Sequence, residues 1–200
     1  MMRRLSLGLT LAAASAIAAP DIALACACCS TPGQRTVEMV PLDASRRAAL
    51  KKLRFTGQAE LYMDERGEES HQGIGSDLSQ YSLQTEWQGN GLVFNLNDGH
   101  GYAGTLALEL PGKISIFEVD PRNTKDTGAG PLLYKEWKVT GKATGSGKFA
   151  ANAAQLLTLI AQGSGIGCTS AADFTHWSLV MQGPKANYMF FGKLTPLKKE

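Results

Sequence analysis

From about residue 55 onward, apolar and polar side chains alternate with a period of two along most of the chain. This period places every second side chain on one face of an extended segment and is typical of half-buried β-strands. The apolar positions are Leu61 and Met63; Tyr81, Leu83 and Trp87; Leu92, Phe94 and Leu96; Leu106, Leu108 and Leu110; Ile114 and Ile116; Leu133, Trp137 and Val139; Trp177, Leu179 and Met181; and Tyr188 and Phe190. The pattern predicts a mainly β chain, a single antiparallel barrel or sandwich of about 8–10 short strands.

Two segments interrupt this simple alternation. Residues 152–162 fit a helix that ends at Gly163, but their short apolar run between presumptive strands favours a strand over residues 155–162. The glycine-rich run over residues 140–148 resembles a phosphate-binding loop, yet Phe149 stands where Ser or Thr would contact magnesium. We therefore interpret this run as a hairpin turn.

The strand that contains Trp137 illustrates how faces are assigned from the pattern. Leu133, Trp137 and Val139 are taken as its apolar face. Lys135 is assigned, with its charged neighbours, to the polar face. A charged side chain at this position is thus expected to meet solvent.

Upstream of the alternation the chain has a different character. Asp43 or Ser45 is suited to cap a short helix that reaches to about Leu53. We expect three parts: a signal peptide over residues 1–25, an N-terminal arm with Cys-x-Cys-Cys and this short helix over residues 26–54, and an antiparallel β domain over residues 55–200.

The first residues carry the features of a secretory signal peptide. Arg3 and Arg4 precede an apolar run, and Ala23 and Ala25 supply the small residues that a cleavage site before Cys26 requires. The protein is therefore expected to be exported, to a periplasm or the medium. Membrane attachment is expected only if the terminal Cys26 is lipidated, and the order of residues before it departs from the usual lipobox.

Charge excludes one class of partner. The formal net charge is +2, and it falls to +1 when residues 1–25 are removed. Nucleic-acid binding requires a clustered basic face, which the sequence lacks, so no nucleic-acid partner is expected.

Neither a nucleophile elbow of the form Gly-x-Ser-x-Gly nor another catalytic motif occurs in a suitable context, and we predict no catalytic residues.

The four cysteines suggest a disulfide in an oxidising compartment. Cys26, Cys28 and Cys29 lie together, whereas Cys168 lies alone in a glycine-rich loop. We predict a bridge from Cys28 or Cys29 to Cys168, closing a loop of more than a hundred residues.

A second interpretation of the same residues is a soft-metal site. Thiolates select copper(I) or zinc over harder ions. Cys26, Cys28, Cys29 and Cys168 would supply thiolates, and His176 would complete the shell. The separated ligand pairs of a typical zinc site are missing, so this interpretation is kept as the alternative.

Aromatic residues suggest a third kind of site. Trp87, Phe94, Trp137 and Trp177 occupy strand positions where they either fill the core or line a ligand cavity, since a barrel of about eight strands holds at most one small ligand. The sequence thus predicts an exported, non-catalytic binding module for a small ligand or a protein partner, and alternatively a periplasmic copper- or zinc-binding protein.

Overall fold

The computed structural model describes residues 31–63, 71–122, 133–150, 155–165 and 170–197. Its elements, in chain order, are β1 (Arg35–Pro41), α1 (Ala44–Lys52), β2 (Gln58–Leu61), β3 (Gln80–Gln88), β4 (Gly91–Asn97), β5 (Ala103–Glu109), β6 (Lys113–Val119), β7 (Leu133–Gly147), β8 (Leu156–Gly165), a 3-10 helix (Ala171–Asp173), β9 (Phe174–Gln182) and β10 (Asn187–Lys193).

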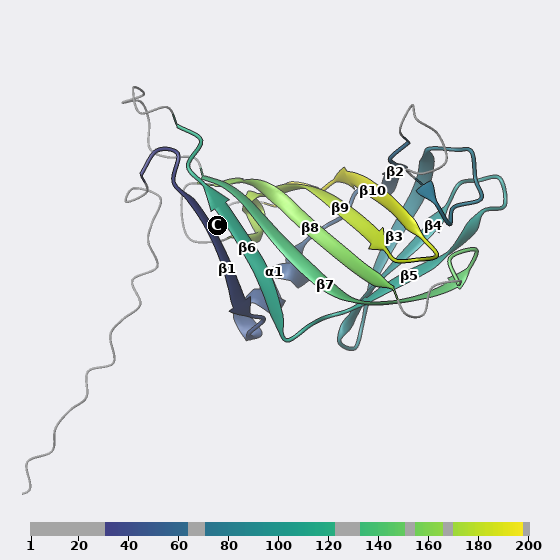
Figure 1. Ribbon diagram of the computed structural model, residues 1–200, viewed down its shortest axis with the longest axis horizontal. Coiled ribbons are helices and arrows are strands. Elements are labelled where there is room, and N and C mark those ends of the chain that lie inside the picture. The colour runs from purple at the N-terminus through teal and green to yellow at the C-terminus, as the bar shows by residue number, and fades with distance from the viewer. Residues whose placement is uncertain (1–30, 64–70, 123–132, 151–154, 166–169, 198–200) are drawn as a thin grey trace, which may run out of the picture.

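Eight of the strands form a closed antiparallel barrel (Figure 1). Their order is β7-β5-β4-β3-β2-β10-β9-β8, and the pairing of β8 with β7 closes the ring. The prediction of an antiparallel β fold is confirmed, and the structure selects the barrel over the sandwich. The strand expected over residues 155–162 is confirmed as β8, which continues to Gly165.

The remaining two strands extend the barrel wall on one side. β6 pairs with the first half of β7, between residues 134 and 138, whereas β5 pairs with the second half, between residues 143 and 147. β1 then pairs with β6 along its whole length. We call β1, β6 and the first half of β7 the extension; it forms the left edge of the sheet in Figure 1, where β1 is drawn in purple.

The second half of β7 corrects the sequence interpretation. Residues 140–147 are not a hairpin turn but a continuous part of the strand. Its glycines permit close packing, because a Cβ atom at Gly141 would lie 2.2 Å from the carbonyl oxygen of Glu109. Glycine-rich composition here marks close backbone approach between strands instead of a chain reversal.

Aromatic and aliphatic side chains fill the barrel. Phe94 and Phe190 are fully buried, and Phe55, which follows α1, packs its ring 5.6 Å from that of Phe94 and 5.5 Å from that of Trp177. α1 contributes Leu50 to this core. The helix thereby attaches to the barrel next to the inner face of the extension.

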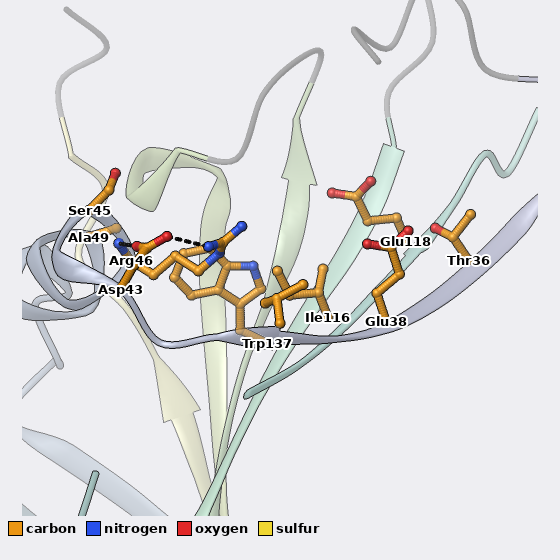
Figure 2. Close-up of a pocket in the computed structure, with 10 residues that line it drawn as sticks. Thr36, Glu38, Asp43, Ser45, Arg46, Ala49, Ile116, Glu118 and Trp137 are labelled. Carbon is orange, nitrogen blue, oxygen red and sulfur yellow. Dashed lines mark hydrogen bonds and ion pairs between the residues drawn. The ribbon is translucent and has the colours of Figure 1, made fainter. Parts of the chain in front are cut away.

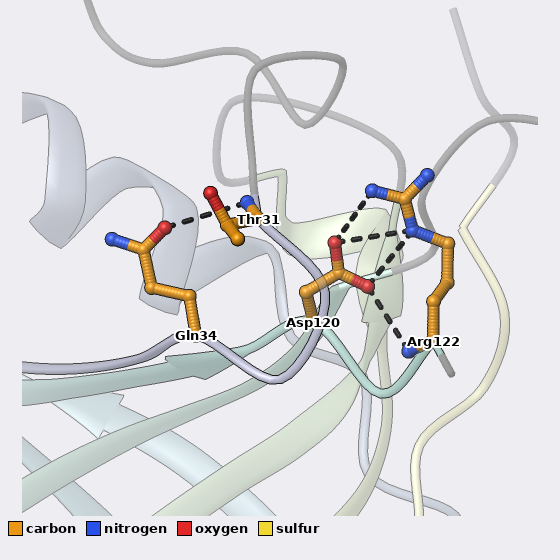
Figure 3. Close-up of polar contacts among 4 residues, drawn as sticks. All are labelled: Thr31, Gln34, Asp120 and Arg122. Carbon is orange, nitrogen blue, oxygen red and sulfur yellow. Dashed lines mark hydrogen bonds and ion pairs between the residues drawn. The ribbon is translucent and has the colours of Figure 1, made fainter. Parts of the chain in front are cut away.

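The chain enters β1 through contacts with the end of β6 (Figure 3). The backbone N–H of Gly33 donates to the carbonyl of Asp120 at 2.8 Å, and the backbone N–H of Asp120 donates to the carbonyl of Gln34 at 3.2 Å. The buried Asp120 carboxylate receives a forked interaction from Arg122, with the shortest contact at 2.7 Å. These bonds fix the described start of the chain, Thr31, at the end of the extension.

Candidate functional site

A pocket of about 470 Å³ lies on the inner face of the extension, beneath the start of α1 (Figure 2). It is lined by three strands and the helix. The lining residues are Thr36, Glu38 and Val40 from β1; Ile116 and Glu118 from β6; Trp137 from β7; and Asp43, Ser45, Arg46 and Ala49 at the start of α1. The volume is typical of a small-molecule site.

The floor of the pocket is apolar apart from one atom. Trp137 is 2 % exposed, and its ring packs edge-on against Phe174 at 5.3 Å between centroids. Its Nε1 has no hydrogen-bond acceptor among the described residues. In Figure 2 the nitrogen-bearing edge of the indole is on the side of the ring toward Arg46, which also lines the pocket. A buried N–H donor without a partner is rare and costly, so this atom is suited to receive an acceptor from a bound molecule.

Two carboxylates lie at one end of the pocket. Glu38 stands opposite Ile116 in the β1–β6 register, and Glu118 lies two residues further along β6. Burial raises the pKa of the Glu118 carboxyl, and the nearby Glu38 and Asp173 raise it further, while Lys135 lowers it. No hydrogen bond to either glutamate carboxylate comes from the residues that the structure describes. Both carboxylates therefore lack a hydrogen-bond partner in the part of the chain that the structure describes.

The opposite end of the pocket is formed by the start of α1. Asp43 caps the helix by accepting from the backbone of Arg46 at 2.8 Å, and its side chain also forms an ion pair with the Arg46 guanidinium. The charges of Asp43 and Arg46 therefore balance each other. The two glutamates leave the pocket with an excess of negative charge.

Beneath Glu118 lies a buried ion pair. Lys135 pairs with Glu118 in the β6–β7 register, and its Nζ is 3.0 Å from the Asp173 carboxylate. Lys135 is fully buried, so its assignment to a solvent-exposed face is wrong. Space for Asp173 exists because β8 has Gly163 and Gly165 here: a Cβ atom at either position would lie within about 2 Å of Asp173.

The other aromatic residues considered for a cavity occupy different surroundings. Phe94 and Trp177 pack together in the barrel core, with 6.3 Å between their ring centroids. Trp87 is half-buried at the end of β3, with the Lys51 ammonium 6.0 Å from its ring. The structure therefore brings Phe94 and Trp177 together in the core, and of the predicted aromatic residues only Trp137, which belongs to the same buried cluster, also lines the pocket.

The candidate disulfide and metal ligands are placed only in part. Cys26, Cys28, Cys29 and Cys168 lie outside the described residues, and their pairing or ligation stays a prediction. His176 is exposed on β9, where its Nδ1 shares a hydrogen bond with the Thr175 hydroxyl at 2.9 Å. Within the described ranges, no group of three or more His, Cys, Asp or Glu side chains could hold a metal ion.

A second, more open depression includes Ser, Asp and His side chains. The Ser76 hydroxyl donates directly to Asp98 at 2.6 Å, and this bond lowers the pKa of the Asp98 carboxyl. His100 contributes its backbone N–H to the same carboxylate at 2.7 Å. A carboxylate held in its ionised form by these donors is a weak base, and the arrangement closes the β4–β5 turn.

Sequence reasoning missed the charged residues of the pocket. The alternation itself predicts where Lys135 lies. Lys135 is two residues before Trp137, so both side chains are on the same face of the strand. Glu38 and Glu118 share faces with Val40 and Ile116 for the same reason. Their convergence depends on the pairing of β1 with β6, which the sequence pattern does not reveal.

No helix among the described residues is both long enough and apolar enough to cross a membrane. Comparisons of the chain with protein-family models, with curated proteins and with solved structures found no match.

Proposed function

We propose that this protein is an exported, non-catalytic binding module whose small ligand occupies the pocket under α1. One observation carries the proposal: Trp137 and Trp177 each have a buried Nε1 that lacks an acceptor among the described residues, and of the two only Trp137 lines this pocket. The Glu38 and Glu118 carboxylates, which have no hydrogen-bond partner among the described residues, add two further groups that a ligand would satisfy. The barrel supplies a rigid support, because β7 belongs to both the closed wall and the floor of the pocket.

The barrel core is filled by side chains, whereas the pocket under α1 is open. Its aromatic side chains contact one another, as the rings of Tyr81 and Phe190 do at 5.0 Å. The pocket is instead open to solvent and has charged walls. A ligand therefore reaches the pocket without rearranging the core.

The indole N–H groups provide a direct test. Three tryptophans give three indole signals in a ¹H–¹⁵N spectrum, and single Trp→Phe variants assign them. A set of small polar fragments should contain compounds that shift the Trp137 signal and leave the signal of Trp177, in the barrel core, unchanged. If no fragment moves the Trp137 signal, or if Trp137 and Trp177 always move together, the proposal is wrong.

Export and disulfide formation belong to the same proposal and have a separate test. The mass of the unreduced protein, isolated from the exporting cell, should correspond to a chain that begins at Cys26. It should increase on reduction and alkylation by the amount expected for a bridge that includes Cys168. A mass that retains residues 1–25 would contradict export with cleavage.

A further inference from the structure

The net negative charge around the pocket favours a positively charged ligand. Glu38 from β1 and Glu118 from β6 carry negative charge into it. The other charged groups that act on Glu118, Lys135 and Asp173, balance each other as an ion pair. At the opposite end of the pocket, Arg46 of α1 is balanced by Asp43. When all these groups are ionised, two negative charges remain. A cation that bridges the two carboxylates relieves their mutual repulsion.

The floor of the pocket requires a second ligand feature. The Trp137 Nε1–H is a donor, so an ammonium group cannot satisfy it, whereas a carbonyl oxygen can. Ile116 is opposite both Glu38 and Trp137 in the register of the extension. Adjacent strands are about 4.8 Å apart, so the backbones of Glu38 and Trp137, on either side of Ile116, are about 10 Å apart, a span that one small molecule bridges between their side chains.

We infer that the pocket selects a small organic cation with a hydrogen-bond acceptor next to its ammonium group, as in an α-amino amide or the free amino terminus of a peptide. The ammonium lies between Glu38 and Glu118, and the carbonyl oxygen accepts from Trp137 Nε1. An apolar substituent packs on Val40 and Ile116. This inference rests on the proposed function and adds the class of ligand.

Three probes with the same branched alkyl group separate these features. L-Leucinamide has both the cation and the acceptor, N-acetyl-L-leucinamide lacks the cation, and 3-methylbutylamine lacks the acceptor. Measurements at pH 6 keep the α-ammonium protonated, since its pKa is about 7.7–8.0. L-Leucinamide should bind more tightly than either of the others and should shift the Trp137 indole signal. 3-Methylbutylamine should bind without a comparable shift.

A matched pair of variants tests the contribution of the carboxylates. The double variant Glu38→Gln, Glu118→Gln keeps the shape of the side chains, and L-leucinamide should bind to it about tenfold more weakly, equivalent to about 1.4 kcal/mol. Glu60→Gln removes a charge from an exposed position on β2, across the barrel, and should leave binding unchanged. Thermal unfolding of each variant verifies that it folds.

The outcomes distinguish the ligand class from the function itself. If N-acetyl-L-leucinamide binds as tightly as L-leucinamide, or if Glu60→Gln weakens binding as much as the double variant, selection for a cation is wrong. If other fragments shift the Trp137 signal and L-leucinamide does not, the ligand class is wrong and the binding function remains. If no compound of either set shifts it, both are wrong.

Discussion

The two halves of β7 have different neighbours although they belong to one uninterrupted strand. In its second half, Ala143 faces a barrel core of aliphatic and aromatic side chains. In its first half, the inward positions carry Lys135 and Trp137, and the neighbouring strand adds Glu118. The change coincides with the exchange of neighbours, from β6 to β5, along one edge of β7.

This difference shows how the fold separates stability from binding. The closed ring of strands excludes water from its packed aromatic rings, and the burial of these apolar side chains stabilises the barrel. Among the described strands, the extension ends at β1, and its inner face combines apolar side chains with two glutamates that are accessible from the pocket. Truncations of the barrel core are therefore expected to act on folding, and substitutions of the two pocket glutamates on the charge of the pocket.

The largest effect is expected from truncating the barrel core. Phe94→Ala removes a fully buried ring that contacts Phe55 and Trp177, and should lower the free energy of unfolding by about 3–5 kcal/mol. Val37→Ala on β1, where the side chain is 69 % exposed, should change it by no more than about 0.5 kcal/mol. Urea denaturation measures both. If both variants lose the same free energy of unfolding, the barrel core does not contribute more to stability than the exposed face of β1.

The buried ion pair gives the next effect. Lys135→Met leaves the Asp173 carboxylate without its ammonium partner and should destabilise the protein by about 3 kcal/mol or more. The double variant Lys135→Met, Asp173→Leu removes both charges and should recover part of this loss. Denaturation of the two single variants and the double variant forms a thermodynamic cycle. Strictly additive losses would contradict a direct interaction between the two side chains.

The predicted disulfide affects the end of the extension. Arg35, Val119, Tyr134 and Ser164 form one cross-strand row. At about 4.8 Å between strands, its ends are about 14 Å apart. Cys29 is six residues before Arg35 and Cys168 four residues after Ser164, so the chain is long enough to bridge this span.

If the bridge forms, Cys168→Ser should lower the free energy of unfolding by about 2–4 kcal/mol. A reductant should have the same effect on the original protein and no further effect on the variant. A chelator that reproduces the loss, where a non-coordinating reductant does not, would favour the metal-binding alternative.

The barrel could be predicted because alternation is a local property. The buried face of each strand follows from the alternation within that strand. Leu92 and Leu96 could therefore be assigned to the core without knowing which strands pair with theirs. The pocket could not be predicted in the same way. It depends on β1 lying beside β6, strands that are separated by more than seventy residues.

Two individual errors have the same physical origin. The Gly141–Gly147 segment was interpreted as a turn because glycine is common in turns, but here it relieves contacts with β5. Lys135 was assigned outward because a charge is rarely buried, although its position in the alternation places it inward. In both cases a tertiary neighbour, Glu109 or Asp173, reversed the ordinary preference of the residue.

The smallest expected effect, a dependence of stability on pH, isolates Glu118. Its pKa is raised in the folded protein from the ordinary value of 4.5, chiefly by burial. Between these two values the folded state binds more protons than the unfolded state, so stability falls as the pH rises and the loss is complete above the folded pKa. Glu118→Gln has no charge to bury and should lack this contribution. The variant should match the original protein near pH 3 and be slightly more stable at pH 7, by less than about 1 kcal/mol because the side chain is only partly buried. Glu60→Gln serves as the control and should follow the original protein across this range. If the Glu118→Gln variant instead becomes less stable than the original protein as the pH rises, the ionised Glu118 carboxylate is favoured in the folded state. The partly buried charge would then stabilise the extension.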